Sequence, residues 1–224
     1  MIYRPILSSS MIDRNETRRY AGAAKARKID DALIDEAIDE VMVIAEPIAS
    51  IERHDYNCMT QRVNVSDEES FLIEGRAIGI HLAGCEEVIL LAVTLGNGVD
   101  DAVTKSFDYG RYAHGVMLDA AATAAVEAAA DETEKIIRAS IEKENYKMRW
   151  RYSPGYGDWP ITAQQAMVRL TKANEIGITL TDKLMLNPQK SITAVIGLAH
   201  GEIERDIKKG CAGCMKSDCP LRRG

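Results

Sequence analysis

The segment that decides the fold is DAAATAAVEAAADETEKIIRASIEKEN, residues 119–145. Alanine is the best helix former and dominates the first half of this segment, which predicts a long helix. Small side chains let neighbouring elements approach closely, so we expect this helix to lie at the centre of the fold. Its second half, Glu132 to Glu144, is charged and amphipathic and is expected to emerge into solvent.

The clearest buried strand is Val88 to Leu95, a continuous β-prone apolar run. It stops at Gly96-Asn-Gly98, and Asp100 and Asp101 follow before a helical pattern. A strand, a glycine turn and a helix resemble a phosphate-binding turn, but the third glycine and the distant acidic partner of that fingerprint are missing. We therefore interpret the turn as a simple strand-to-helix connection.

Shorter elements surround these two. Asp30 or Asp31 is a plausible N-cap for a helix with one apolar face, which Pro47 limits at its end. Further helices are expected over 75–84 and 162–174, and strands over 51–65, 71–73, 148–152, 178–180 and 191–198. The pattern predicts an α+β fold: a single compact domain with a mixed or antiparallel sheet, a long central Ala-rich helix and flanking helices. We divide the chain into a polar N-terminal segment (1–30), the main domain (31–205) and a Cys-rich tail (206–224).

Composition excludes several classes of protein. The chain has 224 residues, 46% hydrophobic and 28% charged, an ordinary globular balance. A net charge of −6 offers no basic surface for duplex DNA, so no nucleic-acid partner is expected. No apolar run has the length of a signal peptide or a membrane span, and the five cysteines do not suggest a secreted disulfide framework. We expect a cytoplasmic protein without a membrane partner.

Features of a binding site gather in one loop, Arg151-Tyr-Ser-Pro-Gly-Tyr-Gly-Asp-Trp159. Proline and glycine together favour a turn of one geometry. Arginine can hold a carboxylate through two parallel hydrogen bonds, and aromatic faces attract cations. The loop is therefore either a site for a small zwitterionic or cationic ligand, or a tight turn in which Trp159 fills the core.

The loop also carries a family resemblance. Its Arg-x-x-Pro-Gly-Tyr pattern resembles the S-adenosylmethionine-binding motif in the activation domain of cobalamin-dependent methionine synthase. The segment from Leu180 to Ile192 resembles that family's L-T-E…M…P…S-V segment, at the expected distance after the loop. The strand ending at Gly96 and the Ala-rich helix resemble the elements that precede the loop, so the similarity spans roughly residues 82–197.

The resemblance implies a function. In that family the domain binds S-adenosylmethionine beside a corrinoid carried by another domain. When the corrinoid is accidentally oxidised to cob(II)alamin, one electron from a flavodoxin-type donor and a methyl group from S-adenosylmethionine restore methylcobalamin. It implies that Arg151 grips the ligand's carboxylate and that Tyr156 lies near the adenosyl or corrinoid face. Ser153 and Gly155 would present backbone groups. Glu127 would meet the ligand's ammonium group, unless it is an exposed or capping carboxylate.

Two departures from the family stand beside this resemblance. Full-length enzymes continue the motif as Pro-Ala-Cys-Pro-Asp-His, where this chain reads Gly157-Asp-Trp-Pro160. Near the last strand the family has a Tyr-Phe pair, where this chain has Val195-Ile-Gly197. The chain shows no methyltransferase, folate or corrinoid module. We therefore expect an accessory protein for a corrinoid-binding methyltransferase such as methionine synthase. Its electron donor would be of the flavodoxin or ferredoxin type. One alternative is a non-catalytic module that binds a corrinoid protein or a ligand, and another is a small metal or iron–sulfur redox protein.

The tail contains Cys211, Cys214 and Cys219 in C-x2-C-x4-C spacing, and the last is followed by proline. Such thiolates can bind zinc or an iron–sulfur cluster, which is the interpretation we favour; the alternatives are a reversible dithiol and an uncommitted tail. The candidates for a fourth ligand are Cys58, Cys85 and His200. Elsewhere, isolated cysteines are expected in the core, and the histidines, which show no ligand spacing, are expected to be structural or at the surface: His54, His81, His114 and His200.

Overall fold

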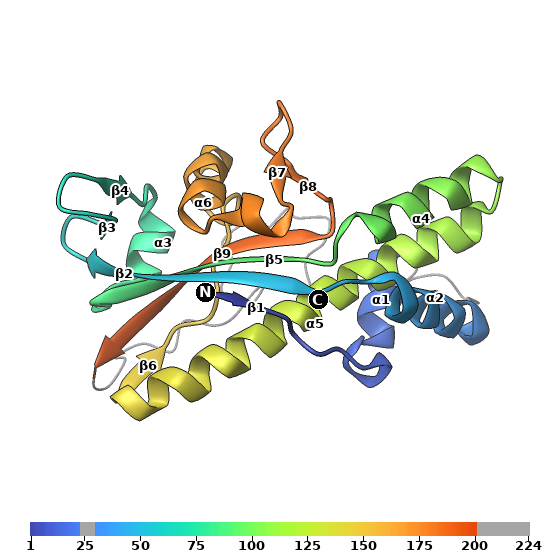
Figure 1. Cartoon of the computed structure of the whole chain (residues 1–224), viewed down its shortest axis with the longest axis horizontal. Helices are drawn as coiled ribbons and strands as arrows, with labels where there is room; N and C mark the ends of the chain where they lie inside the picture. The colour runs from blue at the N-terminus through green and yellow to red at the C-terminus, as the bar shows by residue number, and fades with distance from the viewer. Residues whose placement is uncertain (23–29, 201–224) are drawn as a thin grey trace. The chain divides into compact units, whose positions relative to one another are not determined.

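The computed structural model describes residues 1–22 and 30–200 (Figure 1). Contacts between its elements group the chain into two compact units. Unit 1 comprises Met1–Ser50, Ala92–Lys135 and Lys172–Ile192. Unit 2 comprises Ile51–Leu91, Ile136–Thr171 and, within the described chain, residues 193–200.

Unit 1 is largely helical. Asp30 caps α2 (Asp31–Ile44) as predicted, since its carboxylate accepts a hydrogen bond from the Ala32 amide at 3.0 Å, and the helix ends before Pro47. The polar segment near the N-terminus contains a helix that was not predicted, α1 (Arg14–Tyr20), capped by Asp13 through the Asn15 and Glu16 amides. The remaining short elements of this unit are β1 (Ile2–Tyr3), η1 (Ser9–Met11), η4 (Ala173–Ile176), β7 (Thr179–Leu180) and β8 (Leu186–Asn187).

The predicted long helix is present as α5 (Tyr112–Ile141) and begins seven residues before Asp119. The alanines of its Ala-rich part, Ala120 to Ala130, are buried, with Ala121, Ala125 and Ala129 fully enclosed. Helices α4 (Asn97–Asp108) and α5 form a hairpin (Figure 1). It is close-packed, because a Cβ added to Gly115 would lie 3.2 Å from the Phe107 ring and from Ser106 Cβ. Small side chains thus allow the close approach expected from the sequence.

The main sheet has the strand order β4-β3-β2-β5-β9-β6, and β1 pairs with β2. Its strands are β2 (Ile48–Asn57), β3 (Arg62–Asn64), β4 (Ser70–Leu72), β5 (Glu87–Thr94), β6 (Tyr146–Met148) and β9 (Ser191–His200). The pairings of β1 with β2, β2 with β3, β3 with β4 and β6 with β9 are antiparallel. The predicted α+β class with a long Ala-rich helix is confirmed.

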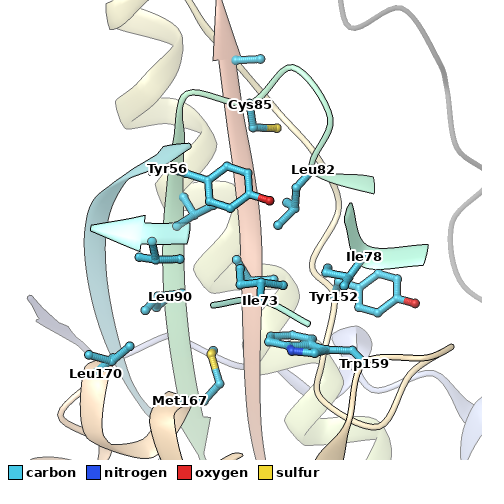
Figure 2. Packing of buried hydrophobic residues seen from close by; sticks show 14 residues of the cluster. Tyr56, Ile73, Ile78, Leu82, Cys85, Leu90, Tyr152, Trp159, Met167 and Leu170 are labelled. Carbon is cyan, nitrogen blue, oxygen red and sulfur yellow. The ribbon is translucent and has the colours of Figure 1, made fainter. Parts of the chain in front are cut away.

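Unit 2 contains the β2-β3-β4 meander, α3 (Arg76–His81), η2 (Glu142–Glu144), β6 and a run of short helices, η3 (Ile161–Ala163) and α6 (Gln164–Leu170). The single irregular strand expected over 51–65 is a hairpin that turns at Gln61, whose φ is +53°. The single helix expected over 162–174 is divided into η3, α6 and η4. The core of unit 2 includes Ile73, Ile78, Leu82, Tyr152 and Trp159 (Figure 2).

Candidate functional site

The strand that leads into the Arg151–Trp159 loop carries a bulge. β6 pairs with β9 as far as Met148 opposite Leu198, and an isolated bridge then joins Tyr152 to Val195. Between these pairs the loop strand advances four residues while β9 advances three, so one extra residue is accommodated before the loop. Bulges bend a strand and redirect side chains, and they are common next to functional sites.

The backbone around Arg151 is held on both sides. The carbonyl of Trp150 lies 2.8 Å from His81 Nε2, and the Tyr152 amide donates to the Val195 carbonyl at 2.9 Å. These groups belong to the two peptide bonds that flank Arg151. The arginine side chain is half-buried and starts from a fixed backbone.

The first half of the loop is a turn closed by the Tyr156 amide, which donates to the Ser153 carbonyl at 3.1 Å. Pro154 precedes Gly155, whose φ is +89°, as a type II turn requires. The Gly155 amide donates to the Trp159 carbonyl at 2.9 Å. The Ser153 amide and the Gly155 carbonyl lie outside these hydrogen bonds and suit contact with a ligand.

The second half of the loop is fixed by two contacts within unit 2. Gly157 has a φ of +53°, and an added Cβ would lie 2.3 Å from the Tyr152 hydroxyl, so any larger residue would force the buried Tyr152 ring to move. Asp158 accepts hydrogen bonds from the Arg76 amide at 2.7 Å and the Ala77 amide at 3.0 Å. Its carboxylate therefore caps α3, whose N-cap residue is Gly75 and provides no side-chain cap.

The loop aromatics divide between core and surface. Trp159 is buried and belongs to the unit 2 core, as does Tyr152 (Figure 2). Tyr156 is 51% exposed and meets the Tyr152 ring edge-on at 6.1 Å between centroids. Trp159 therefore fills the core, as one of the two predictions for the loop had it, and the ligand site, which is the other, stays a prediction.

The other predicted site residues lie elsewhere. Glu127 is half-buried on α5, in the part of that helix that belongs to unit 1. Cys211, Cys214 and Cys219 lie outside the described residues. Within residues 1–22 and 30–200, no group of three or more His, Cys, Asp or Glu side chains could hold a metal ion. Cys85 is buried as predicted, and burial raises the pKa of its thiol to about 11, which suits a core residue rather than a ligand.

Sequence reasoning missed the residues that brace the loop. His81 lies at the end of α3 and Asp158 at the end of the motif, and neither has a local pattern that shows its partner. It also missed a cavity of about 450 Å3 beside the end of the loop. The cavity is lined by Trp159, Pro160, residues of β4 and the loop after it (Phe71, Leu72, Glu74), and residues of η3 and α6 (Thr162, Ala163, Gln165, Ala166, Arg169).

One Ser-His-Glu cluster in unit 1 is structural. His114 Nδ1 lies 3.1 Å from Ser106 Oγ, and His114 Nε2 lies 2.9 Å from Glu40. The serine is buried within α4, and its hydroxyl donates to the Ala102 carbonyl at 2.9 Å. The cluster joins α2, α4 and α5 and presents no accessible nucleophile.

Comparison with known proteins identifies the family. Residues 10–204 match the family described as vitamin B12 dependent methionine synthase, activation domain. The chain belongs to this family. Curated proteins give no match. Among solved structures, a crystal structure of the MetH reactivation domain bound to AdoHcy is 16% identical, with a TM-score of 0.66 over 88% of this chain and 78% of that chain.

Membership of the activation-domain family confirms the predicted resemblance, and the solved structure confirms the fold. The structure also explains one departure from the family pattern. At Gly197 a side chain would collide with its neighbours, because an added Cβ would lie 2.5 Å from Cys85 Sγ and 2.8 Å from Leu82 Cδ2. Val195 and Ile196 are fully buried. No helix among the described residues is both long and apolar enough to cross a membrane.

Proposed function

We propose that this chain binds S-adenosylmethionine at the Arg151–Trp159 loop and supports reductive remethylation of a corrinoid carried by a partner methyltransferase. The observation that carries the proposal is the fixed geometry of Arg151 and the turn after it, in a chain of the activation-domain family. The similar MetH reactivation domain, which was crystallised with AdoHcy, supports the same ligand class.

The residues of the loop fit such a ligand. The guanidinium of Arg151 matches a carboxylate in charge and geometry, because it offers parallel N–H donors. The Ser153 amide and Gly155 carbonyl supply one donor and one acceptor at the turn, and Tyr156 offers an exposed ring for stacking. Glu127 is assigned to the ammonium group as part of this proposal.

The chemistry requires positioning rather than an acid or base from this chain. S-adenosylmethionine supplies a methyl group on a good leaving group, and the corrinoid supplies the nucleophile once a flavodoxin- or ferredoxin-type donor has reduced it. The role of the loop is to hold the sulfonium ligand in one orientation at the surface where the partner docks. The exposed position of Tyr156 suits that surface.

A reactivation assay tests this proposal. The wild-type chain is mixed with a partner protein loaded with cob(II)alamin, a low-potential reductant and S-adenosylmethionine, and the methylcobalamin spectrum and S-adenosylhomocysteine are measured. With S-adenosylmethionine below saturation, wild type and Arg138→Ala, which removes an exposed arginine of α5, should give both products at the same rate, and Arg151→Ala should give both about tenfold or more slowly. Activity of Arg151→Ala equal to that of wild type would contradict the proposal.

A second candidate, a ligand- or corrinoid-protein-binding module without turnover, is favoured by the residues at Val195, Ile196 and Gly197. These replace the aromatic pair of the family, and the packing around Gly197 leaves no room for a side chain. Ligand binding without methylcobalamin formation from any native corrinoid partner would favour this candidate. The Cys211, Cys214 and Cys219 tail remains a proposed zinc or iron–sulfur site, to be tested by elemental analysis of anaerobically purified protein.

A further inference from the structure

His81 contacts the loop from the end of α3, a helix that the loop itself caps. Asp158 binds the first amides of α3, and His81 Nε2, at the last residue of that helix, lies 2.8 Å from the Trp150 carbonyl. The same short helix is therefore bonded to the residue before Arg151 and to the residue before Trp159. It fixes the separation between the two ends of the loop.

The hydrogen bond of His81 has one possible direction. A backbone carbonyl can only accept, so Nε2 carries the proton and donates. The ring is 1% exposed, and burial lowers the pKa of His81 to about 4, so the ring is neutral and Nδ1 is an acceptor. Nδ1 is buried and makes no hydrogen bond within the described chain. A buried nitrogen without a hydrogen bond lowers the stability of the fold. A residue that only fills space in the core does not usually carry such a nitrogen.

The ring also packs against the aromatic side chains on either side of Arg151. Its centroid lies 4.3 Å from Trp150 and 5.4 Å from Tyr152. Tyr152 is itself paired with Val195 through both backbone groups, at 2.9 and 2.8 Å. His81 thus completes the restraint of the two peptides that flank Arg151, one through its hydrogen bond and the other through its contact with Tyr152.

We infer that His81 is a positioning residue for ligand binding: its Nε2–H bond to the Trp150 carbonyl orients Arg151 toward the ligand's carboxylate. The inference rests on the proposed S-adenosylmethionine site and adds a residue of α3 to it. Because His81 acts through Arg151, substituting His81 should lower the affinity only for ligands that bind the Arg151 side chain. A purely structural role would weaken every ligand equally.

The test is a double-mutant cycle measured by calorimetry with two ligands. His81→Phe keeps a ring but removes the donor, whereas His81→Gln places an amide donor near the position of Nε2. Each is combined with Arg151→Ala and titrated with S-adenosylmethionine and with 5′-methylthioadenosine, which lacks the aminocarboxylate. If His81→Phe fails to fold, as judged by circular dichroism, His81→Asn replaces it, because its shorter amide cannot reach the carbonyl.

We expect His81→Phe to weaken S-adenosylmethionine about tenfold, the loss of roughly one buried hydrogen bond, with His81→Gln close to wild type. Binding of 5′-methylthioadenosine should be unchanged, and in the Arg151→Ala background His81→Phe should have no further effect. Equal weakening of both ligands, or additivity with Arg151→Ala, would overturn the inference while the proposed function stands. Failure of wild type to bind S-adenosylmethionine would overturn both.

Discussion

Two glycine-containing turns of this chain each follow a strand and each carry an aspartate, yet only one has the features of a ligand site. In the turn after β5, the Gly96 amide donates to Thr94 Oγ1 at 3.1 Å, and Asp100 accepts from the Gln189 amide at 2.6 Å. In the Arg151–Trp159 loop, Asp158 also serves the fold, but the half-buried Arg151 and the exposed Tyr156 remain on the surface.

The turn after β5 and the Arg151–Trp159 loop differ in their charge and in the hydrogen bonds that their polar groups make. The first turn of α4 carries Asp100 and is followed by Asp101, so the helix end that could attract a phosphate is negatively charged. The prediction of a simple strand-to-helix turn is consistent with these bonds. We propose the loop, rather than the turn after β5, as the ligand site, because there a braced backbone carries the half-buried Arg151 and the exposed Tyr156.

The largest expected effect distinguishes the glycines of the two turns. Gly157→Ala should lower the free energy of unfolding by about 4 kcal/mol, because φ is left-handed and the new Cβ would lie 2.3 Å from the Tyr152 hydroxyl. Gly96→Ala also has a positive φ, but its Cβ would meet only Glu46, at 3.6 Å or more, so about 2 kcal/mol is expected. Denaturant unfolding measures both. Equal losses would show that the loop is not braced by this contact.

The second prediction concerns the buried groups beside each turn. Lys190 is paired with Asp119 at 2.7 Å near the β5 turn, whereas His81 beside the loop is neutral. Burial, with a smaller contribution from the Arg149 charge, lowers the pKa of His81 from 6.5 to about 4, although the Trp150 carbonyl opposes the shift. Below pH 6.5 the unfolded chain therefore binds a proton that the folded chain does not, and stability is lost as the pH falls.

The titration of His81 should lower the free energy of unfolding by about 3 kcal/mol between pH 6.5 and pH 4. Its contribution should change no further below pH 4. Carboxylates titrate in the same range, so the quantity to measure is the difference between wild type and His81→Gln at each pH. A difference that does not vary with pH would contradict a buried neutral His81.

A smaller effect separates the two aspartates. Asp158→Ala removes the cap of α3 and should cost about 1 kcal/mol of stability, and it should also weaken ligand binding because one end of the loop is released. Asp100→Ala removes the acceptor of the Gln189 amide and should leave ligand affinity unchanged. Thermal unfolding and calorimetry on both variants provide the comparison. An equal loss of affinity in Asp100→Ala and Asp158→Ala would contradict a role of Asp158 in holding the loop.

The sequence predicted those elements whose signal is local. The apolar run of β5 and the alanines of α5 determine their structure through propensity and burial, and Asp30 caps its helix through its own neighbours. Helix α1 was missed because it is polar and has few buried residues, although Asp13 and Glu16 stand at the spacing of a capping pair. The start of α5 at Tyr112 was missed because no alanine run marks it.

The candidate site also has one part with a local sequence signal and one part without. Proline and glycine at 154 and 155 encode the turn locally, so the loop could be found from the sequence. Its bracing could not, because His81 and Trp150 are 69 residues apart and Arg76 and Asp158 are 82 apart. Likewise, the requirement for glycine at 197 depends on Cys85 and Leu82 from a distant segment. Only the fold shows such pairs.

The most direct test of the central claim is calorimetric titration of S-adenosylmethionine into three proteins: wild type, Arg151→Ala and the control Arg138→Ala. Wild type and the control should bind one equivalent with equal affinity, and Arg151→Ala should bind about tenfold to a hundredfold more weakly, as expected for the loss of a charge-assisted pair. No heat with wild type, or equal affinity for wild type and Arg151→Ala, would contradict the assignment of the loop as the S-adenosylmethionine site.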